Sequence, residues 1–193
     1  MENKSGAPVP HRAEADAWDE ARLVGHLRSL EIPFETHRHP PLHTVEESRE
    51  LRGVMPGAHI KNMFLKGKKG ELWLVACIEN RKIHIRDLEK RLGAQKMSFG
   101  KPELLWDALG VRPGSVTPAA VLNDPEGRVR IALDAALSTA ERVNFHPLHN
   151  EATIGMAPSE LVRLLECVQH APLMLDFDEL ETLARVRAEN KGG

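Results

Sequence analysis

Histidine and cysteine are the side chains of this sequence that could hold a metal ion. Five of the ten histidines fall in two groups around prolines: His37, His39 and His43, then His146 and His149. Zinc sites use such spacings, but they add a cysteine or carboxylate ligand of matching geometry. The two cysteines, Cys77 and Cys167, are isolated, and no His-Glu-x-x-His helix occurs. We therefore expect no metal site and no cofactor.

Nucleophilic catalysis by a protein side chain is also not indicated. No Gly-x-Ser-x-Gly elbow occurs, and Ser115 lies in a glycine-proline loop with no base visible beside it. Cys77 sits in the middle of an apolar segment, where its thiol should be protonated and inert. Neither a Walker A motif nor Gly-x-Gly-x-x-Gly is present, so no phosphate-binding loop is predicted.

Polar residues interrupt the start of an expected strand at GAHIKNMFLK, residues 57 to 66. His59, Lys61 and Asn62 surround a single apolar residue, Ile60, where a buried sheet would favour valines. Gly57 lies just before them and permits the close approach of another chain. A half-buried lysine without a partner is costly unless an anion meets it. Lys61 is therefore a candidate anion-binding residue.

Further basic residues lie close to Lys61 in the sequence. They are Lys66, Lys68 and Lys69, and, before the strand, Arg49 and Arg52. A run of this kind is typical of a solvated hairpin and helix surface, but it also suits contact with a nucleic acid. The net charge is -2, so any such contact needs a local patch. Both interpretations remain open on charge alone.

The elements that position these residues can be predicted from periodicity, capping residues and turns. We expect helices over 14–30, 44–53 (from a capping box), 87–92 and 102–109, a helix starting at Ser159, and a last helix capped by 178–181. We expect strands over 34–39, 60–65, 72–78, 128–133 and 142–145. Segments 60–65 and 72–78 should form a hairpin with a basic loop, and 112–118 should be a shaped loop.

This order of elements predicts one α/β domain. Helices and strands are interspersed and several connections resemble hairpins, which favours a mixed, mostly antiparallel sheet over a parallel one. The sheet should be flanked by helices, with 72–78 central and buried on both faces. Residues 1–12 should be a flexible N-terminal tail and 13–189 the domain. We expect buried free thiols, no signal peptide, no membrane partner and a cytoplasmic location.

Three groups of motifs resemble a known family when taken in order. They are HTVEESRELRGVMPGAHIKNMFLK, then LGVRPGSVTP with VLND, then NFHPL. They resemble bacterial YbaK-like proteins and prolyl-tRNA synthetase-associated editing domains, and within these the free-standing branch that deacylates alanyl-tRNA(Pro). The resemblance extends over residues 18–170. It implies a compact α/β domain with a mixed, barrel-like sheet.

The activity implied by the resemblance is the hydrolysis of mischarged alanyl-tRNA(Pro) in trans. A proline-sized synthetase pocket rejects a smaller amino acid by only ~1–3 kcal/mol, so a second site must remove the wrong product. The implied partners are the acceptor stem and 3′ end of tRNA(Pro), with prolyl-tRNA synthetase as a further candidate. Water would attack the ester directly, oriented by the free ribose hydroxyl, without a covalent intermediate or a cofactor.

The resemblance also implies a role for particular residues. Lys61 would bind the phosphate of the terminal nucleotide, with Asn62 beside it, because a lysine of pKa ~10.4 is charged at neutral pH. The loop of Gly114 and Ser115 would hold the ester carbonyl. His146 would hold that loop or the substrate amine, or be structural. The expected substrate-binding residues are Val116, Thr117, Ala119 and His59, and the expected tRNA-binding residues are Arg49, Arg52, Lys66, Lys68 and Lys69.

One departure from the family pattern leaves the substrate open. The family commonly has phenylalanine after Gly-Ser-Val-Thr-Pro, where this chain has Ala119 and Ala120. A larger pocket would favour a related activity, the removal of cysteine from the same tRNA. The alternatives to an editing enzyme are a module that binds tRNA or a synthetase without hydrolysis, and a small-molecule-binding or nucleotide-binding protein that uses the same cleft.

Overall fold

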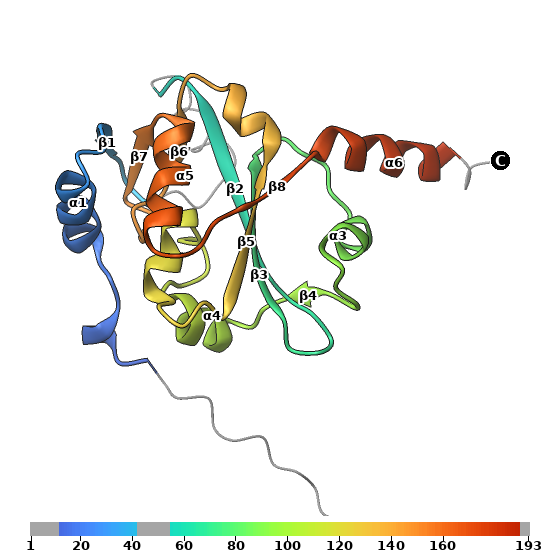
Figure 1. Ribbon diagram of the computed structural model, residues 1–193, viewed down its shortest axis with the longest axis horizontal. Helices are drawn as coiled ribbons and strands as arrows, with labels where there is room; N and C mark the ends of the chain where they lie inside the picture. Colours follow the sequence, from blue (N-terminus) through green and yellow to red (C-terminus); the bar gives the residue numbers. More distant parts are fainter. Residues whose placement is uncertain (1–11, 42–54, 190–193) are drawn as a thin grey trace, which may run out of the picture.

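A mixed sheet lies at the centre of the computed structural model, which describes residues 12–41 and 55–189 (Figure 1). In this part of the chain the sheet has eight strands in the order β1-β7-β6-β2-β3-β5-β8, with β4 paired to β2. The strands are β1 (Phe34–Arg38), β2 (Ala58–Lys66), β3 (Leu72–Ile78), β4 (Ser98–Phe99), β5 (Val129–Asp134), β6 (Val143–Phe145), β7 (Ala152–Met156) and β8 (Leu173–Leu175).

The strand pairing is mixed, as the sequence predicts. The β1–β7, β6–β7, β2–β3 and β2–β4 pairs are antiparallel. The β2–β6, β3–β5 and β5–β8 pairs are parallel. Strand β3 lies between β2 and β5 and is buried along almost its whole length, which confirms its predicted central place in the sheet.

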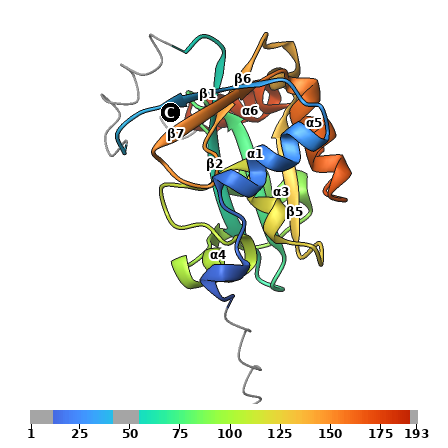
Figure 2. The ribbon, with the colours of Figure 1, turned by 90° about the vertical axis from the view of Figure 1, so that its left-hand side faces the viewer.

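Helices cover both faces of the sheet (Figures 1 and 2). On one face lie α1 (Glu20–Ser29), α4 (Pro102–Leu109) and α5 (Pro158–Cys167), and their buried leucines share the larger hydrophobic core. On the other face lie α3 (Ile85–Leu92) and α6 (Phe177–Glu189), which pack on a second core with the odd-numbered side chains of β2 and β3. No helix in the described ranges is long and apolar enough to span a membrane.

Short 3-10 turns complete the described part. They are η1 (Glu14–Asp16), η2 (Pro118–Asn123) and η3 (Ala135–Thr139). Helices α3 and α4 end at glycines in the left-handed conformation, Gly93 and Gly110, as predicted. At Gly110 a side chain would also collide with Asn123, because an added Cβ would lie 2.9 Å from the Asn123 amide.

Some sequence predictions are wrong in detail. The first helix begins at Glu20, not Glu14, because Asp19 caps it by accepting a hydrogen bond from the Arg22 amide. The last helix is capped by Asp176, whose carboxylate accepts from the amides of Asp178 and Glu179.

Other differences concern elements and exposure. Cys167 is exposed rather than buried. It is the last residue of α5, at the C-terminal end of the helix. Strands β4, β7 and β8 were not predicted. The expected helix over 44–53 and residues 1–11 of the expected tail lie outside the described residues.

Candidate functional site

Strand β2 is only partly paired along one side. β6 pairs with Ala58 and His59 at its start, and β4 pairs with Leu65 and Lys66 at its end. Between these, residues 60–64 pair with β3 on the other side, and no strand in the described ranges pairs with them on this one. We call residues 60–64 the open edge of β2. The polar residues singled out in the sequence, Lys61 and Asn62, lie on it.

Asn62 connects the open edge to the predicted glycine-proline loop. Its Nδ2 donates a hydrogen bond of 3.0 Å to the carbonyl oxygen of Val116. Its Oδ1 is buried and has no hydrogen-bond partner within the described residues, and the same is true of the hydroxyl of Thr117. Buried polar atoms without partners are rare in native proteins and mark places where a ligand can bind.

The loop before Thr117 presents backbone amides. Gly114 has a φ of +89°, which favours glycine, and the Ser115 amide is occupied by the carbonyl of Arg112 at 3.0 Å. The amides of Gly114 and Val116 have no partner in the part of the chain that is described. Asn150 Nδ2 lies 4.0 Å from the position of a Cβ on Gly114, so the loop borders the segment that follows β6.

His146 lies on that segment, one residue after β6. Its Nδ1 is 3.0 Å from the carbonyl oxygen of Ala152, so this nitrogen carries the proton and donates. Burial lowers the pKa of His146, and the hydrogen bond to Ala152 opposes this only in part. His146 is therefore neutral near pH 7, with an electron pair available on Nε2. The ring of His39 faces it, with centroids 6.2 Å apart.

Lys61 points to the opposite face of β2 from Asn62, because neighbouring side chains alternate along a strand. It is half-buried beside its cross-strand neighbour Cys77, and its Nζ donates a hydrogen bond of 2.5 Å to the carbonyl of Arg81. The structure therefore does not bring the Lys61 ammonium to the 114–117 loop. His59, on the same face as Lys61, bonds through Nε2 to the carbonyl of Met55 at 3.2 Å.

Cys77 is buried near the end of β3, and burial raises the pKa of its thiol to about 12. This agrees with the prediction that the Cys77 thiol is protonated. Ala119 is also fully buried, in the larger core between α4 and α5, and Val116 is half-buried next to Asn62. Among residues 12–41 and 55–189, no group of three or more His, Cys, Asp or Glu side chains could hold a metal ion.

The lysines predicted to contact tRNA separate into two groups. Lys66 and Lys68 line a groove beside the end of β2, together with two lysines that were not predicted from the sequence, Lys96 and Lys101. Lys69 lies at the hairpin tip and is not part of the groove lining. Arg49, Arg52 and His43 lie outside the described residues. Lys96 and Lys101 were missed because they join the groove only when β4 pairs with β2.

Comparisons with known proteins identify relatives across most of the chain. A family model described as "Aminoacyl-tRNA editing domain" matches residues 39–164. Prolyl-tRNA synthetase associated domain-containing protein 1 of Danio rerio is 36% identical over 174 residues, which cover 89% of this chain and 90% of that protein. Prolyl-tRNA editing protein ProX of Acetoanaerobium sticklandii is 29% identical over 145 residues, covering 75% of this chain and 88% of that protein.

Solved structures show the same fold. A crystal structure described as a candidate trans-editing enzyme for prolyl tRNA synthetase superposes with a TM-score of 0.64 at 19% identity. The superposition covers 89% of this chain and 98% of that one. It confirms the predicted α/β architecture around a mixed sheet.

Proposed function

Because the chain belongs to the aminoacyl-tRNA editing domain family, we propose that it hydrolyses mischarged alanyl-tRNA(Pro) in trans. The observation that carries the proposal is two buried oxygens, Asn62 Oδ1 on the open edge and Thr117 Oγ1 in the adjoining loop, which have no partner among the described residues. The names of the ProX relative and of the similar structure support the choice of the proline system.

The two oxygens suit the α-ammonium group of an aminoacyl ester. Asn62 Oδ1 is an acceptor, and its orientation is fixed because Nδ2 is held by the Val116 carbonyl. The Thr117 hydroxyl can accept a second N–H from the same group. An ammonium bound here places the ester carbonyl beside the 114–116 backbone.

The free amides of this loop suit the carbonyl oxygen. Attack by water turns that oxygen into an oxyanion, and backbone N–H groups held in advance stabilise such a charge. Gly114 and Val116 offer two amides, whereas the Ser115 amide is already occupied. The contribution of Ser115 would then be its place in the turn or its hydroxyl.

His146 is suited to a proton-accepting role in this scheme. It is neutral, and Nε2 can accept a hydrogen bond from the attacking water or from the free ribose hydroxyl beside the ester. The water oxygen bonds to the carbonyl carbon, and the bond from that carbon to the ribose oxygen breaks. The ribose oxygen takes up a proton, and free alanine and tRNA are released. No protein nucleophile takes part.

Lys61 keeps its proposed role as the anchor for the terminal phosphate. In this arrangement the phosphate lies on the face of β2 opposite to Asn62. An ammonium group has three N–H donors, and the Arg81 carbonyl uses one of them. The remaining donors are available to a phosphate that lies along the edge. His59, which precedes it on the same face, is proposed to support this arrangement.

The proposal is tested by ester hydrolysis on alanyl-, cysteinyl- and prolyl-tRNA(Pro). We expect rapid loss of alanine, little loss of proline, and a large decrease in kcat/KM for Lys61→Ala and Asn62→Ala. Lys82→Ala, at an exposed position on the loop after β3, is the matched control and should retain activity. Hydrolysis of none of the esters would favour a binding module, and preferential loss of cysteine would identify the related activity.

A further inference from the structure

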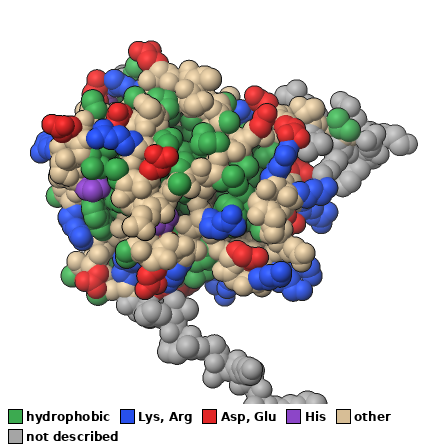
Figure 3. Space-filling model, viewed as in Figure 1, with side chains coloured by type: hydrophobic (Ala, Val, Ile, Leu, Met, Phe, Trp, Pro, Cys, Tyr) green, Lys and Arg blue, Asp and Glu red, His purple; other side chains and the backbone are tan. Residues whose placement is uncertain are grey.

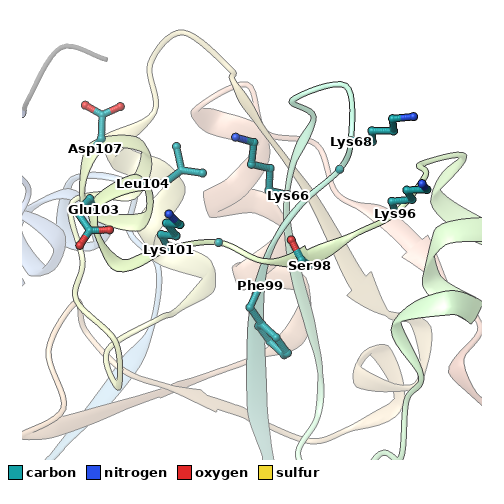
Figure 4. Close-up of a pocket in the computed structure, with 11 residues that line it drawn as sticks. Lys66, Lys68, Lys96, Ser98, Phe99, Lys101, Glu103, Leu104 and Asp107 are labelled. Carbon is teal, nitrogen blue, oxygen red and sulfur yellow. The ribbon is translucent and has the colours of Figure 1, made fainter. Parts of the chain in front are cut away.

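Four lysines from separate segments line one groove beside the end of β2, with Lys68 and Lys96 on one side of it and Lys66 and Lys101 on the other (Figure 4). Lys66 ends β2, Lys68 belongs to the hairpin loop, Lys96 precedes β4, and Lys101 precedes α4. The groove has a volume of about 800 Å³, and Ser98 and Leu104 also line it. In Figure 4 the Lys66 and Lys101 side chains approach the same space next to Leu104.

The charge of the groove is not neutralised from within the molecule. Among the described residues, none of these four ammonium groups has an ion-pair or hydrogen-bond partner. Of the two carboxylates at the groove, Asp107 is already paired with Arg128 at 3.1 Å, which leaves Glu103. Figure 3 shows basic side chains gathered at the lower right, over the tip of the β2–β3 hairpin. The groove therefore favours an anion with several charges.

The groove and the candidate site lie along the same strand, β2. Lys66 and Asn62 are four residues apart on β2 and share one face of the strand, about 13 Å apart. Phe64 lies between them on the same face and is buried. Gly100 covers its ring, and the Gly100 amide bonds to the Phe64 carbonyl at 2.9 Å. Gly100, which also lines the groove, therefore lies at the end of the open edge.

We propose that this lysine groove binds the phosphate backbone of the RNA whose charged 3′ end lies at the open edge of β2. The inference rests on the proposed function and adds a second contact to it. A span of about 13 Å is long enough for a few nucleotides between Asn62 and Lys66. The positive N-terminal end of α4, at Lys101 and Pro102, adds to the attraction for phosphate.

The test measures binding of uncharged tRNA(Pro) by fluorescence anisotropy at several salt concentrations. The variant is Lys66→Gln with Lys101→Gln, and the control is Lys82→Gln with Lys90→Gln, which removes the same charge from exposed positions outside the groove. We expect the groove variant to bind at least about tenfold more weakly at low salt. The slope of log affinity against log salt should decrease by about 1 for each phosphate that the variant no longer binds. The control should bind like the wild type.

Activity measurements separate this proposal from the proposed function. With alanyl-tRNA(Pro), the groove variant should raise KM and leave kcat nearly unchanged, because the groove lies away from the ester. If the wild type hydrolyses no ester but the groove variant still binds tRNA more weakly than the wild type, the proposed function is refuted and the groove proposal is supported.

Three results would overturn the groove proposal. One is wild-type affinity in the groove variant. Another is an equal loss of affinity in both double variants, which would indicate a general effect of charge. The last is displacement of tRNA by polyglutamate at equal charge concentration, which would identify an acidic protein segment as the occupant.

Discussion

Two oxygen atoms, Asn62 Oδ1 on the open edge and Thr117 Oγ1 in the adjoining loop, are buried without hydrogen-bond partners among the described residues. Burying an unsatisfied polar atom costs the folded state about 1–3 kcal/mol. Sites that depart from good local packing in this way are often functional. At the scale of single residues, the free protein is therefore less stable than its packing allows, and a ligand would recover part of that cost.

Thr117→Val tests this directly, because valine has nearly the same shape and lacks the hydroxyl. We expect the free energy of unfolding, measured by urea denaturation, to rise by about 1 kcal/mol. We expect kcat/KM for alanyl-tRNA(Pro) to fall about tenfold, which corresponds to the loss of one hydrogen bond to the substrate.

Thr139→Val is the matched control for this substitution. The exposed Thr139 hydroxyl donates to the Ala136 carbonyl at 2.9 Å, so its removal should lower stability slightly and leave activity unchanged. A Thr117→Val protein that is fully active and no more stable than the wild type would remove Thr117 from the substrate site.

At the scale of elements, Arg81 fastens helix α6 to the sheet. Its guanidinium bonds to the fully buried carboxylate of Asp134 at 2.9 Å, and to Asp178 and Glu181 of α6. The carbonyl of the same residue accepts the Lys61 hydrogen bond. The docking of α6 and the position of the Lys61 ammonium therefore both depend on a single residue, Arg81, in the loop that follows β3.

Arg81→Met should lower the free energy of unfolding by about 3 kcal/mol, because it leaves the buried Asp134 carboxylate without its cation. Urea denaturation measures this loss of stability. Hydrogen exchange should also show that the backbone amides of α6 exchange faster in the variant. Arg86→Met, at an exposed position on α3, should change stability by less than about 0.5 kcal/mol.

Adding Asp134→Asn to Arg81→Met should recover part of the lost stability, since the buried charge is then removed. If the single Arg81→Met variant were as stable as Arg86→Met, the buried pair would not hold this part of the structure together.

At the scale of the whole molecule, a buried pair joins the end of α5 to the start of β5. His170 Nε2 lies 3.2 Å from Asp124 Oδ2, and the same oxygen accepts the Val129 amide at 2.6 Å. The hydrogen bond to Asp124 raises the pKa of His170, against the effect of burial. Burial alone would raise the pKa of Asp124, but the bonds from His170 and the Val129 amide outweigh it and the pKa is lowered.

The pair predicts that stability changes with pH in two ranges. The pKa of His170 is raised on folding. Its contribution to the free energy of unfolding is therefore complete below the unfolded pKa of about 6.5, and it is lost as pH rises through the pKa of the folded state. The pKa of Asp124 is lowered on folding. Its contribution to the free energy of unfolding is therefore present above the unfolded pKa of about 3.9, and it is lost as pH falls through the pKa of the folded state.

Urea denaturation across pH 5 to 9 should therefore show that the stability difference between the wild type and His170→Gln shrinks as pH rises. His84→Gln, at an exposed histidine, is the control and should show no such trend. A difference that stays constant with pH would mean that His170 acts in the fold as a neutral side chain.

The sequence was sufficient for elements whose signals are local. The hairpin of β2 and β3, the helices that end at Gly93 and Gly110, and the buried strand β3 follow from neighbouring residues. The start of α1 was misjudged because Trp18 continues the apolar spacing of the helix. In the fold the backbone amide of Trp18 donates a hydrogen bond of 2.7 Å to Asn123 Oδ1, and Trp18 lies before the helix.

By itself, the sequence determined the mixed α/β fold and the burial of Cys77, and it singled out the strand that carries Lys61 and Asn62 as a candidate site. Only the tertiary structure decided that these two side chains point to opposite faces, that Asn62 bonds to the Val116 carbonyl, and that Lys96 and Lys101 join Lys66 in a groove. The reason is physical. Secondary structure depends on residues within a few positions, whereas hydrogen-bond partners and converging charges depend on which distant segments the sheet brings together.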